Sequence, residues 1–190
     1  MQLNVEVKAR CHDPIASRAA LLALGAHLVG VDNQIDTYFT CSRGRLKLRE
    51  GTLENCLISY TREDGLQPKQ SRIILAETEP GTDLKAVLTQ ALGVLVIVDK
   101  VRELYRLSNV RLHIDEVRGL GHFIEIEVVT KDEEGGMEGL HEQCESLMSV
   151  LRIKTEDLLA ASYSDMILAQ RPVDSLRDDT VLPLRETENA

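Results

Sequence analysis

Charged side chains alternate with apolar ones in five segments of this sequence, and most of these charges are positive. In Arg45-Leu46-Lys47-Leu48-Arg49, every second residue is a cation. A β-strand sends successive side chains to opposite faces, so each segment predicts a strand with one apolar and one charged face. The charged positions are Glu6, Lys8, Arg10, Arg45, Lys47, Arg49, Lys100, Arg102, Arg111, Asp115, Glu125 and Glu127.

This concentration of cations runs against the composition of the chain. Its 190 residues include 22 Lys and Arg against 31 Asp and Glu, which gives a formal net charge of −9. If the strands form one sheet, their cations share a surface, and we expect an anionic ligand there. The carboxylates among them could either neutralise the cations in ion pairs or hold a divalent metal such as Mg²⁺ that bridges to phosphate oxygens. The two roles can coexist in one site.

Composition disfavours several other classes of protein. The four cysteines show no Cys-x-x-Cys spacing and the five histidines no ligand spacing, which argues against a disulfide framework or a zinc site. The negative net charge and the small number of aromatic residues argue against nucleic-acid binding. No secretory signal or membrane-spanning run is evident. We therefore expect a cytoplasmic monomer or homodimer that acts on a small molecule, with no nucleic-acid or membrane partner.

The elements that must position these charges are about eight strands, most of them joined by short turns. Consecutive strands of this kind favour an antiparallel sheet that curls or closes. Closure would place the charges inside a lumen, where like charges only a few ångströms apart require a ligand or counterion. Strands are expected at about 3–10, 27–31, 34–40, 45–50, 55–61, 69–76, 94–107, 110–117 and 123–129, and helices at 15–24, 84–92, 137–151 and 155–170.

The predicted fold class is therefore α+β: a closed eight-stranded antiparallel β-barrel with helices packed on its outside. Leu159, Tyr163 and Met166 fall at helical spacing and predict an apolar stripe that covers the barrel exterior. The domain is expected to span residues 1–170. Residues 171–190 contain two prolines and mixed charges without periodicity, which predicts a flexible tail.

Several ordered motifs of this chain resemble those of the CYTH superfamily, which groups class IV adenylyl cyclases, thiamine triphosphatases and related triphosphate tunnel enzymes. The likeness covers about residues 3–170 and is nearest to the cyclase-like branch. The motifs that carry it are Asn4-Val5-Glu6-Val7-Lys8, Asp36-Thr37-Tyr38-Phe39, Leu46-Lys47-Leu48-Arg49, Lys100-Val101-Arg102 with Tyr105, and Asp115 followed by residues 119–127.

The resemblance implies a closed tunnel in which basic side chains grip a triphosphate and glutamates bind Mg²⁺ or Mn²⁺. By position it implies metal ligation by Glu6, Glu125 and Glu127, with Asn4 as a weak ligand. It also implies that Tyr38 lies beside Lys8 and helps to activate a water, with both as catalytic residues. The implied phosphate contacts are Lys8, Arg10, Lys47, Arg49, Lys69, Lys100 and Arg102.

The chain departs from the family pattern at two places. Asn4 is neutral where the family usually has a carboxylate, and residues 55–61 lack the lysine often found there, with Arg62 or Lys69 as the nearest replacement. Hydrolysis and cyclisation need nearly the same site and differ in whether water or a ribose hydroxyl is aligned for attack. We expect a metal-dependent triphosphate hydrolase; the alternatives are an adenylyl cyclase that forms cyclic AMP and a catalytically weak triphosphate-binding module.

Individual residues also have plain structural interpretations. Arg111 could be a solvated charge at a sheet edge. Glu127 could pair with Arg102, and Asp115 could orient Arg49, in each case without touching a metal. The hydroxyl of Tyr38 could be structural. The three-dimensional arrangement decides which of these pairs form.

Overall fold

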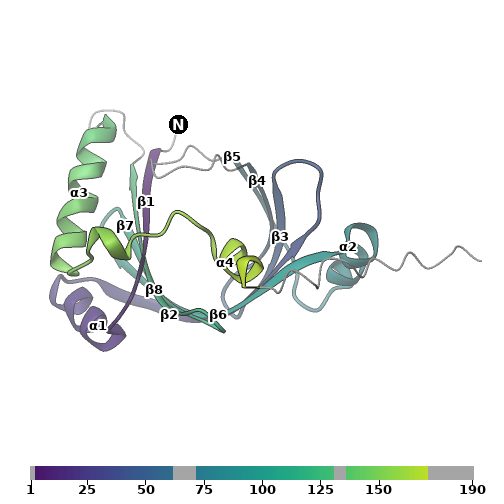
Figure 1. Ribbon diagram of the computed structural model, residues 1–190, viewed down its shortest axis with the longest axis horizontal. Coiled ribbons are helices and arrows are strands. Elements are labelled where there is room, and N and C mark those ends of the chain that lie inside the picture. The colour runs from purple at the N-terminus through teal and green to yellow at the C-terminus, as the bar shows by residue number, and fades with distance from the viewer. Residues whose placement is uncertain (1–2, 62–71, 131–135, 171–190) are drawn as a thin grey trace, which may run out of the picture.

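The protein folds around a single antiparallel sheet of eight strands that curls into an open half-barrel (Figure 1). The computed structural model describes residues 3–61, 72–130 and 136–170. The strands are β1 (Leu3–Arg10), β2 (His27–Phe39), β3 (Arg45–Glu50), β4 (Asn55–Thr61), β5 (Arg72–Glu77), β6 (Val94–Leu107), β7 (Val110–Val117) and β8 (Gly121–Thr130). Their order across the sheet is β1-β8-β7-β6-β2-β3-β4-β5.

In the described part of the chain, four α-helices and one 3₁₀ turn accompany the sheet. They are α1 (Pro14–Ala23), α2 (Leu84–Leu92), α3 (Gly136–Val150), η2 (Thr155–Asp157) and α4 (Tyr163–Ala169). Helix α1 begins as its sequence predicts, because the Asp13 side chain accepts a hydrogen bond from the Ala16 amide and Pro14 occupies the first turn. No helix among the described residues is long and apolar enough to cross a membrane.

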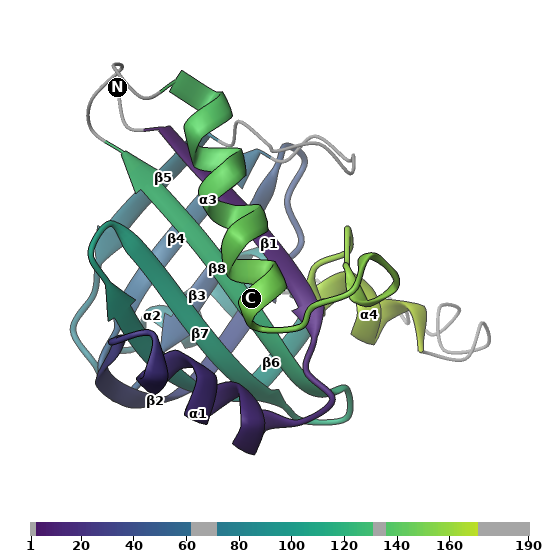
Figure 2. The same ribbon diagram turned by 90° about the vertical axis from the view of Figure 1, so that its left-hand side faces the viewer.

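The main hydrophobic core lies on the convex face of the sheet. Apolar residues of β1, β7 and β8, such as Val5, Leu112 and Ile126, are almost fully buried there. Leu147 of α3 and Leu21 of α1 belong to the same core. Figure 2 shows α3 lying along the outside of β1 and β8. This core fixes the backbone of the strands whose opposite faces carry the charges.

Helix α4 lies on the concave side of the sheet, so the prediction that every helix packs on the outside is wrong for this one (Figure 1). Its Tyr163 packs with Tyr38, Val96, Val98 and Phe123, which share a face with the charged side chains of their strands. One end of the concave face is therefore apolar. The stripe of α4 covers that end, which explains why the helix is inside.

The predicted helix 155–170 is also wrong in its extent. Only η2 and α4 are helical, and between them the chain is extended beside β1. The Leu159 amide donates to the Lys8 carbonyl, and Leu158 forms an isolated bridge with Ala9. A new helix then begins at Ser162, whose hydroxyl accepts from the Asp165 amide in a capping box.

The sheet is open, so the predicted closed barrel is wrong. Among the described residues, β1 and β5 are the two edges of the sheet. Backbone groups at the end of β1 bind residues 158–159 instead of another strand of the sheet, and α4 occupies part of the concave side. The two segments predicted at 27–31 and 34–40 are one continuous strand, β2, with an irregularity between Leu28 and Gly30. The predicted tail, 171–190, lies outside the described residues.

Candidate active site

The charged side chains of the predicted strands share the concave face of the sheet. Cross-strand register places Glu6 opposite Glu127, and Lys8 opposite Glu125. The same layers continue across β7, where His113 is opposite Glu125. Directly opposed residues of antiparallel strands point to the same face, so alternation and register together gather these groups.

Glu125 is the centre of the first group of ion pairs. Lys8 Nζ lies 2.8 Å from its Oε1, and Arg102 Nη2 lies 2.6 Å from its Oε2. His113 Nδ1 lies 3.2 Å from the same Oε2. Burial disfavours the charged carboxylate, but Arg102 and Lys8 outweigh that effect and hold the pKa of Glu125 well below its usual value. Glu125 is therefore an anion despite being buried.

Asp115 extends this group toward α4. Arg102 donates to both of its oxygens, at 2.7 and 2.6 Å, and the Tyr163 hydroxyl donates to Oδ2 at 2.8 Å. Lys100 Nζ lies 3.6 Å from Oδ2. Arg102 thus bridges two buried carboxylates, a bidentate arrangement that suits a planar guanidinium.

Asp36 is the centre of a second group, on β2 and β3. It accepts from Lys47 Nζ at 2.7 Å and from Arg49 at 2.8 and 3.0 Å. Arg49 also donates to Glu54 at 2.8 Å. Burial would raise the pKa of Asp36, but Lys47 and Arg49 hold it well below its usual value. Lys47 and Arg49 are therefore held in place by Asp36, which was not among the predicted site residues.

Lys100 is the cation most affected by its surroundings. Its side chain is 3% exposed, and Arg102 is two residues further along β6, on the same face of the sheet. Burial, aided by the charge of Arg102, lowers the pKa of Lys100 to about 7. Its ammonium is therefore easily deprotonated, and an anionic ligand would stabilise the charged form.

Two tyrosines border the charged groups. Tyr163, which was expected on the outside, has its ring centroid 3.8 Å from Lys8 Nζ and 5.5 Å from Lys100 Nζ. Tyr38 lies on β2 beside Lys47, with its ring 5.4 Å from the Lys47 Nζ. The tyrosine at Lys8 is thus Tyr163 and not Tyr38. Burial raises the pKa of Tyr38 to about 12, which disfavours a phenolate base; its catalytic role stays a prediction.

The carboxylates suit a hard divalent cation by donor type. Glu6 and Glu127 are opposed across β1 and β8, and Glu125 is two residues from Glu127 on the same face. Carboxylate oxygens are the ligands that Mg²⁺ and Mn²⁺ prefer. The described residues contain no converged group of three or more metal-ligating side chains. Glu125 is oriented toward Lys8 and Arg102, so metal binding would require it to exchange one of these partners.

The remaining candidates lie at the margins. Arg10 is exposed, and its guanidinium carbon lies 5.6 Å from the centroid of the Phe123 ring. Arg45 contacts the N-terminus of α4, with its Nη2 2.9 Å from Asp165. Asn4 lies in β1 opposite Val129, but its side chain, like the whole of Lys69, falls outside the described part of the chain.

The structure also decides between the pairings left open by the sequence. Glu127 pairs with Arg111, with Nη1 and Oε2 3.3 Å apart. Asp115 pairs with Arg102 and Lys100. The proposed pairs Glu127–Arg102 and Asp115–Arg49 are therefore not the ones the structure shows.

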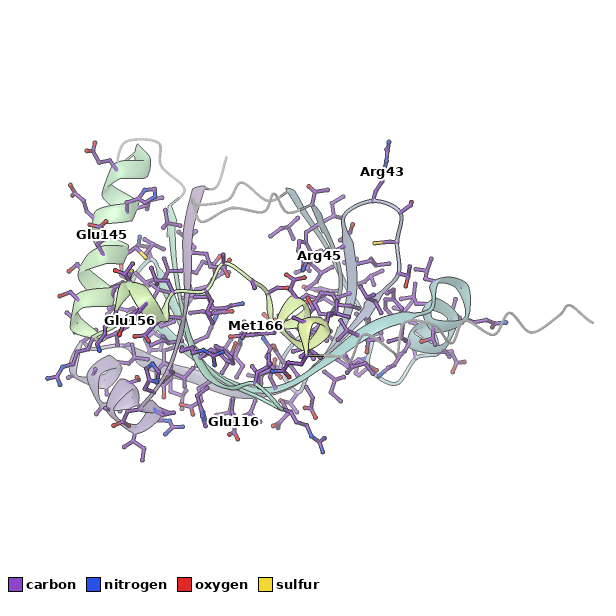
Figure 3. The ribbon with its side chains drawn as sticks, viewed as in Figure 1. Arg43, Arg45, Glu116, Glu145, Glu156 and Met166 are labelled. Atoms are coloured by element: carbon purple, nitrogen blue, oxygen red, sulfur yellow. The ribbon has the colours of Figure 1, made fainter. Side chains whose placement is uncertain are left out.

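Three residues at this face were missed as site candidates: Asp36, His113 and Tyr163. Asp36 alternates with Tyr38 in its strand, and His113 alternates with Asp115, so the period-two pattern that found the cations would have found both. Tyr163 comes from a helix. No strand pattern could have placed it beside Lys8. Figure 3 shows its helix within the curl, where Met166 is labelled, whereas Glu116 projects from the convex face.

The open antiparallel sheet with a charged concave face is the fold of a CYTH domain. The chain belongs to the CYTH domain family, whose model matches residues 2–163. The fold is similar to that of the PH1012 protein from Pyrococcus horikoshii, with 24% identity, a TM-score of 0.70, and 86% of this chain and 98% of that one covered. It is also similar to a Vibrio parahaemolyticus protein named a "putative adenylate cyclase", with 19% identity, a TM-score of 0.67, and 88% and 98% covered. A search of curated proteins finds no match to this chain.

Proposed function

We propose that this protein is a Mg²⁺- or Mn²⁺-dependent enzyme that hydrolyses a triphosphate. The observation that carries the proposal is the layer of cations on the concave face, where Lys8, Lys47, Arg49, Lys100 and Arg102 face the same side as a small set of carboxylates. Family membership and the name of the Vibrio neighbour support a triphosphate as the substrate class.

The protein groups would act mainly by electrostatic stabilisation and positioning. Triphosphate oxygens would replace carboxylates as partners of Lys47, Arg49 and Lys8, so the cations are oriented before the substrate arrives. Arg102 would keep Asp115 and part of Glu125 neutralised throughout. Because these groups are held by ion pairs, little reorganisation is needed during phosphoryl transfer.

Glu6, Glu125 and Glu127 are the residues that would hold the metal. The metal would neutralise charge on the phosphate oxygens as the phosphoryl group transfers. Lys8 then has a second function, because its ammonium on Glu125 competes with the metal for the same carboxylate. A triphosphate that draws Lys8 away from Glu125 would make that carboxylate available.

The test is a turnover assay with tripolyphosphate, ATP and thiamine triphosphate, each with Mg²⁺ and Mn²⁺, that measures phosphate and cyclic AMP separately. We expect metal-dependent phosphate release. Glu125→Gln should lower turnover on the order of a hundredfold or more while tripolyphosphate still raises the melting temperature. Cyclic AMP as the main product would overturn hydrolysis in favour of cyclisation. Metal-dependent turnover of none of the three would leave only a binding module.

A further inference from the structure

The side chain of Gln34 lies on the concave face of β2 with one of its two polar atoms unsatisfied. Gln34 is 1% exposed, and its Nε2 donates to Asp32 Oδ2 at 2.6 Å. Its Oε1 is buried and has no hydrogen-bond partner among the described residues. Most buried polar atoms of native proteins do have such a partner. This oxygen is therefore an acceptor that a donor could reach in another state of the protein.

The direction of the Gln34 amide is fixed by Asp32. Asp32 is fully buried, and its Oδ1 accepts hydrogen bonds from the Leu53 amide and the Thr52 hydroxyl, both at 2.9 Å. Burial would raise the pKa of Asp32, but its hydrogen-bond donors lower it, so the group is a carboxylate. A carboxylate only accepts hydrogen bonds. Gln34 must therefore turn its NH₂ group toward Asp32 and its carbonyl away.

The donor opposite this carbonyl is Lys100. The two residues are direct partners across β2 and β6, and the Cβ atoms of such partners are about 5 Å apart. The Lys100 ammonium lies 3.6 Å from Asp115 Oδ2, which is too long for a hydrogen bond. Arg102 Nη2 already holds that oxygen at 2.6 Å. An ammonium has three N–H groups to donate, so Lys100 has what the Gln34 carbonyl lacks.

A neutral acceptor is well suited to hold this cation. Asp36, Asp115 and Glu125 also act on Lys100 through their charges, but each of them has cations of its own. A carboxylate that held Lys100 would neutralise it and would repel an incoming anion. The Gln34 carbonyl can orient the ammonium and leave its whole charge for the ligand.

We propose that Gln34 positions Lys100 for a bound triphosphate: as the ammonium turns toward the ligand, one of its N–H groups donates to Gln34 Oε1. The inference rests on the proposed function and adds a positioning residue to it. The turn between β3 and β4 takes part indirectly, because it fixes Asp32, and Asp32 fixes the amide of Gln34.

The experiment measures the affinity of the full-length protein for tripolyphosphate by calorimetry in Gln34→Met, Lys100→Met and the double variant. We expect Gln34→Met to weaken binding about tenfold, the effect of one hydrogen bond to a charged group. In the Lys100→Met background, the same change should have less than about a twofold effect, because Gln34 acts through Lys100. The matched control is Gln143→Met on α3, where Gln143 is hydrogen-bonded to Asn109; it should leave the affinity unchanged.

Asp32→Asn is a second test, in which the proposal and simple electrostatics predict opposite signs. Removing a buried negative charge from the concave face would by itself strengthen the binding of an anion. However, Asp32 Oδ1 accepts from two donors and Oδ2 from Gln34, so asparagine would place its NH₂ group at the Oδ2 position. That group would donate to Gln34 Oε1 and turn the Gln34 NH₂ toward Lys100. We therefore expect Asp32→Asn to weaken tripolyphosphate binding about tenfold.

The outcomes separate this inference from the proposed function. Stronger binding by Asp32→Asn, or an equal effect of Gln34→Met with and without Lys100, would overturn the inference while triphosphate turnover stands. No binding of tripolyphosphate by the unmodified protein would overturn the proposed function, and with it the state in which this contact forms. Melting temperatures check that the variants are folded. Asp32→Asn is nearly isosteric, so it decides the question if Gln34→Met does not fold.

Discussion

The two sides of the half-barrel are built differently. The charged wall, formed by β1, β7 and β8, has its convex face buried against α3 and α1, and its concave face carries Lys8, His113 and Glu125. On the other side, edge strand β5 has exposed apolar side chains on both of its faces, including Ile74 and Leu75. Charged groups act on a ligand only if they are held in position. The packed core behind β1, β7 and β8 holds the backbone of the strands that carry them.

The largest expected effect of this difference is on folding stability, at Arg102. Arg102→Met leaves the buried carboxylates of Asp115 and Glu125 without their shared cation, so we expect the free energy of unfolding to fall by about 3–5 kcal/mol. Urea unfolding measures it. The control is Arg118→Met, whose side chain is 84% exposed and pairs with Asp99; it should cost less than about 1 kcal/mol. Equal losses in the two variants would mean that the buried ion pairs of Asp115 and Glu125 stabilise the fold no more than an exposed pair does.

A smaller effect should appear in the pH dependence of ligand binding, through Lys100. Its folded pKa of about 7 lies below the ordinary 10.5, so the ammonium is lost as the pH rises above 7. Tripolyphosphate should bind with proton uptake, and its affinity should fall by up to about tenfold per pH unit between pH 7 and 9. In the free protein, the unfolded chain binds more protons between about pH 7 and 10.5, so this group's contribution to stability rises with pH there.

Calorimetric titrations in buffers of different ionisation enthalpy measure that proton uptake. Lys100→Arg is the matched variant, because its guanidinium stays charged and leaves only the ionisation of the ligand itself. The same pH slope in both proteins would show that Lys100 does not titrate on binding, and that the cations of β6 behave like those of an exposed surface.

The smallest effect is expected at the rim of the charged wall. Arg111 is 46% exposed in its side chain and pairs with Glu127 at 3.3 Å. Arg111→Gln should therefore change the free energy of unfolding by about 1 kcal/mol or less, because exposed ion pairs gain little in water. Thermal or urea unfolding checks this. A cost near that of Arg102→Met would extend the rigid part of the wall to its edge and weaken the contrast with β5.

Local sequence pattern was sufficient for most strands and for the charged face. Segments such as Arg45–Glu50 and Val110–Val117 alternate so regularly that both their extent and their facing could be predicted. The helix predicted at residues 84–92 is observed as Leu84–Leu92, and it ends at Gly93, which has a positive φ. These features depend on neighbours in the sequence, which is why they were accessible.

The parts that could not be predicted depend on distant neighbours. Leu159, Tyr163 and Met166 have helical spacing, but residues 158–159 form backbone contacts with β1, and this breaks the segment into two pieces. Which face α4 covers depends on an apolar patch assembled from Tyr38, Val96 and Phe123 of three strands. Closure of the sheet likewise depends on whether its two edges find one another or other partners.

The pairing of β1 with β8 has a consequence for the order in which the chain folds. Leu3 pairs with Thr130, so the charged wall joins the first strand to the last. By contrast, β2 pairs with β3, β3 with β4 and β4 with β5, so these strands pair with neighbours in the sequence. Contacts between distant residues carry a larger loop-closure cost and form slowly. On a chain that emerges from the ribosome, β2, β3, β4 and β5 can pair with one another while β1 still lacks its partner. Lys8 meets Glu125 only after the last strand has been synthesised, and Tyr163 reaches Lys8 still later.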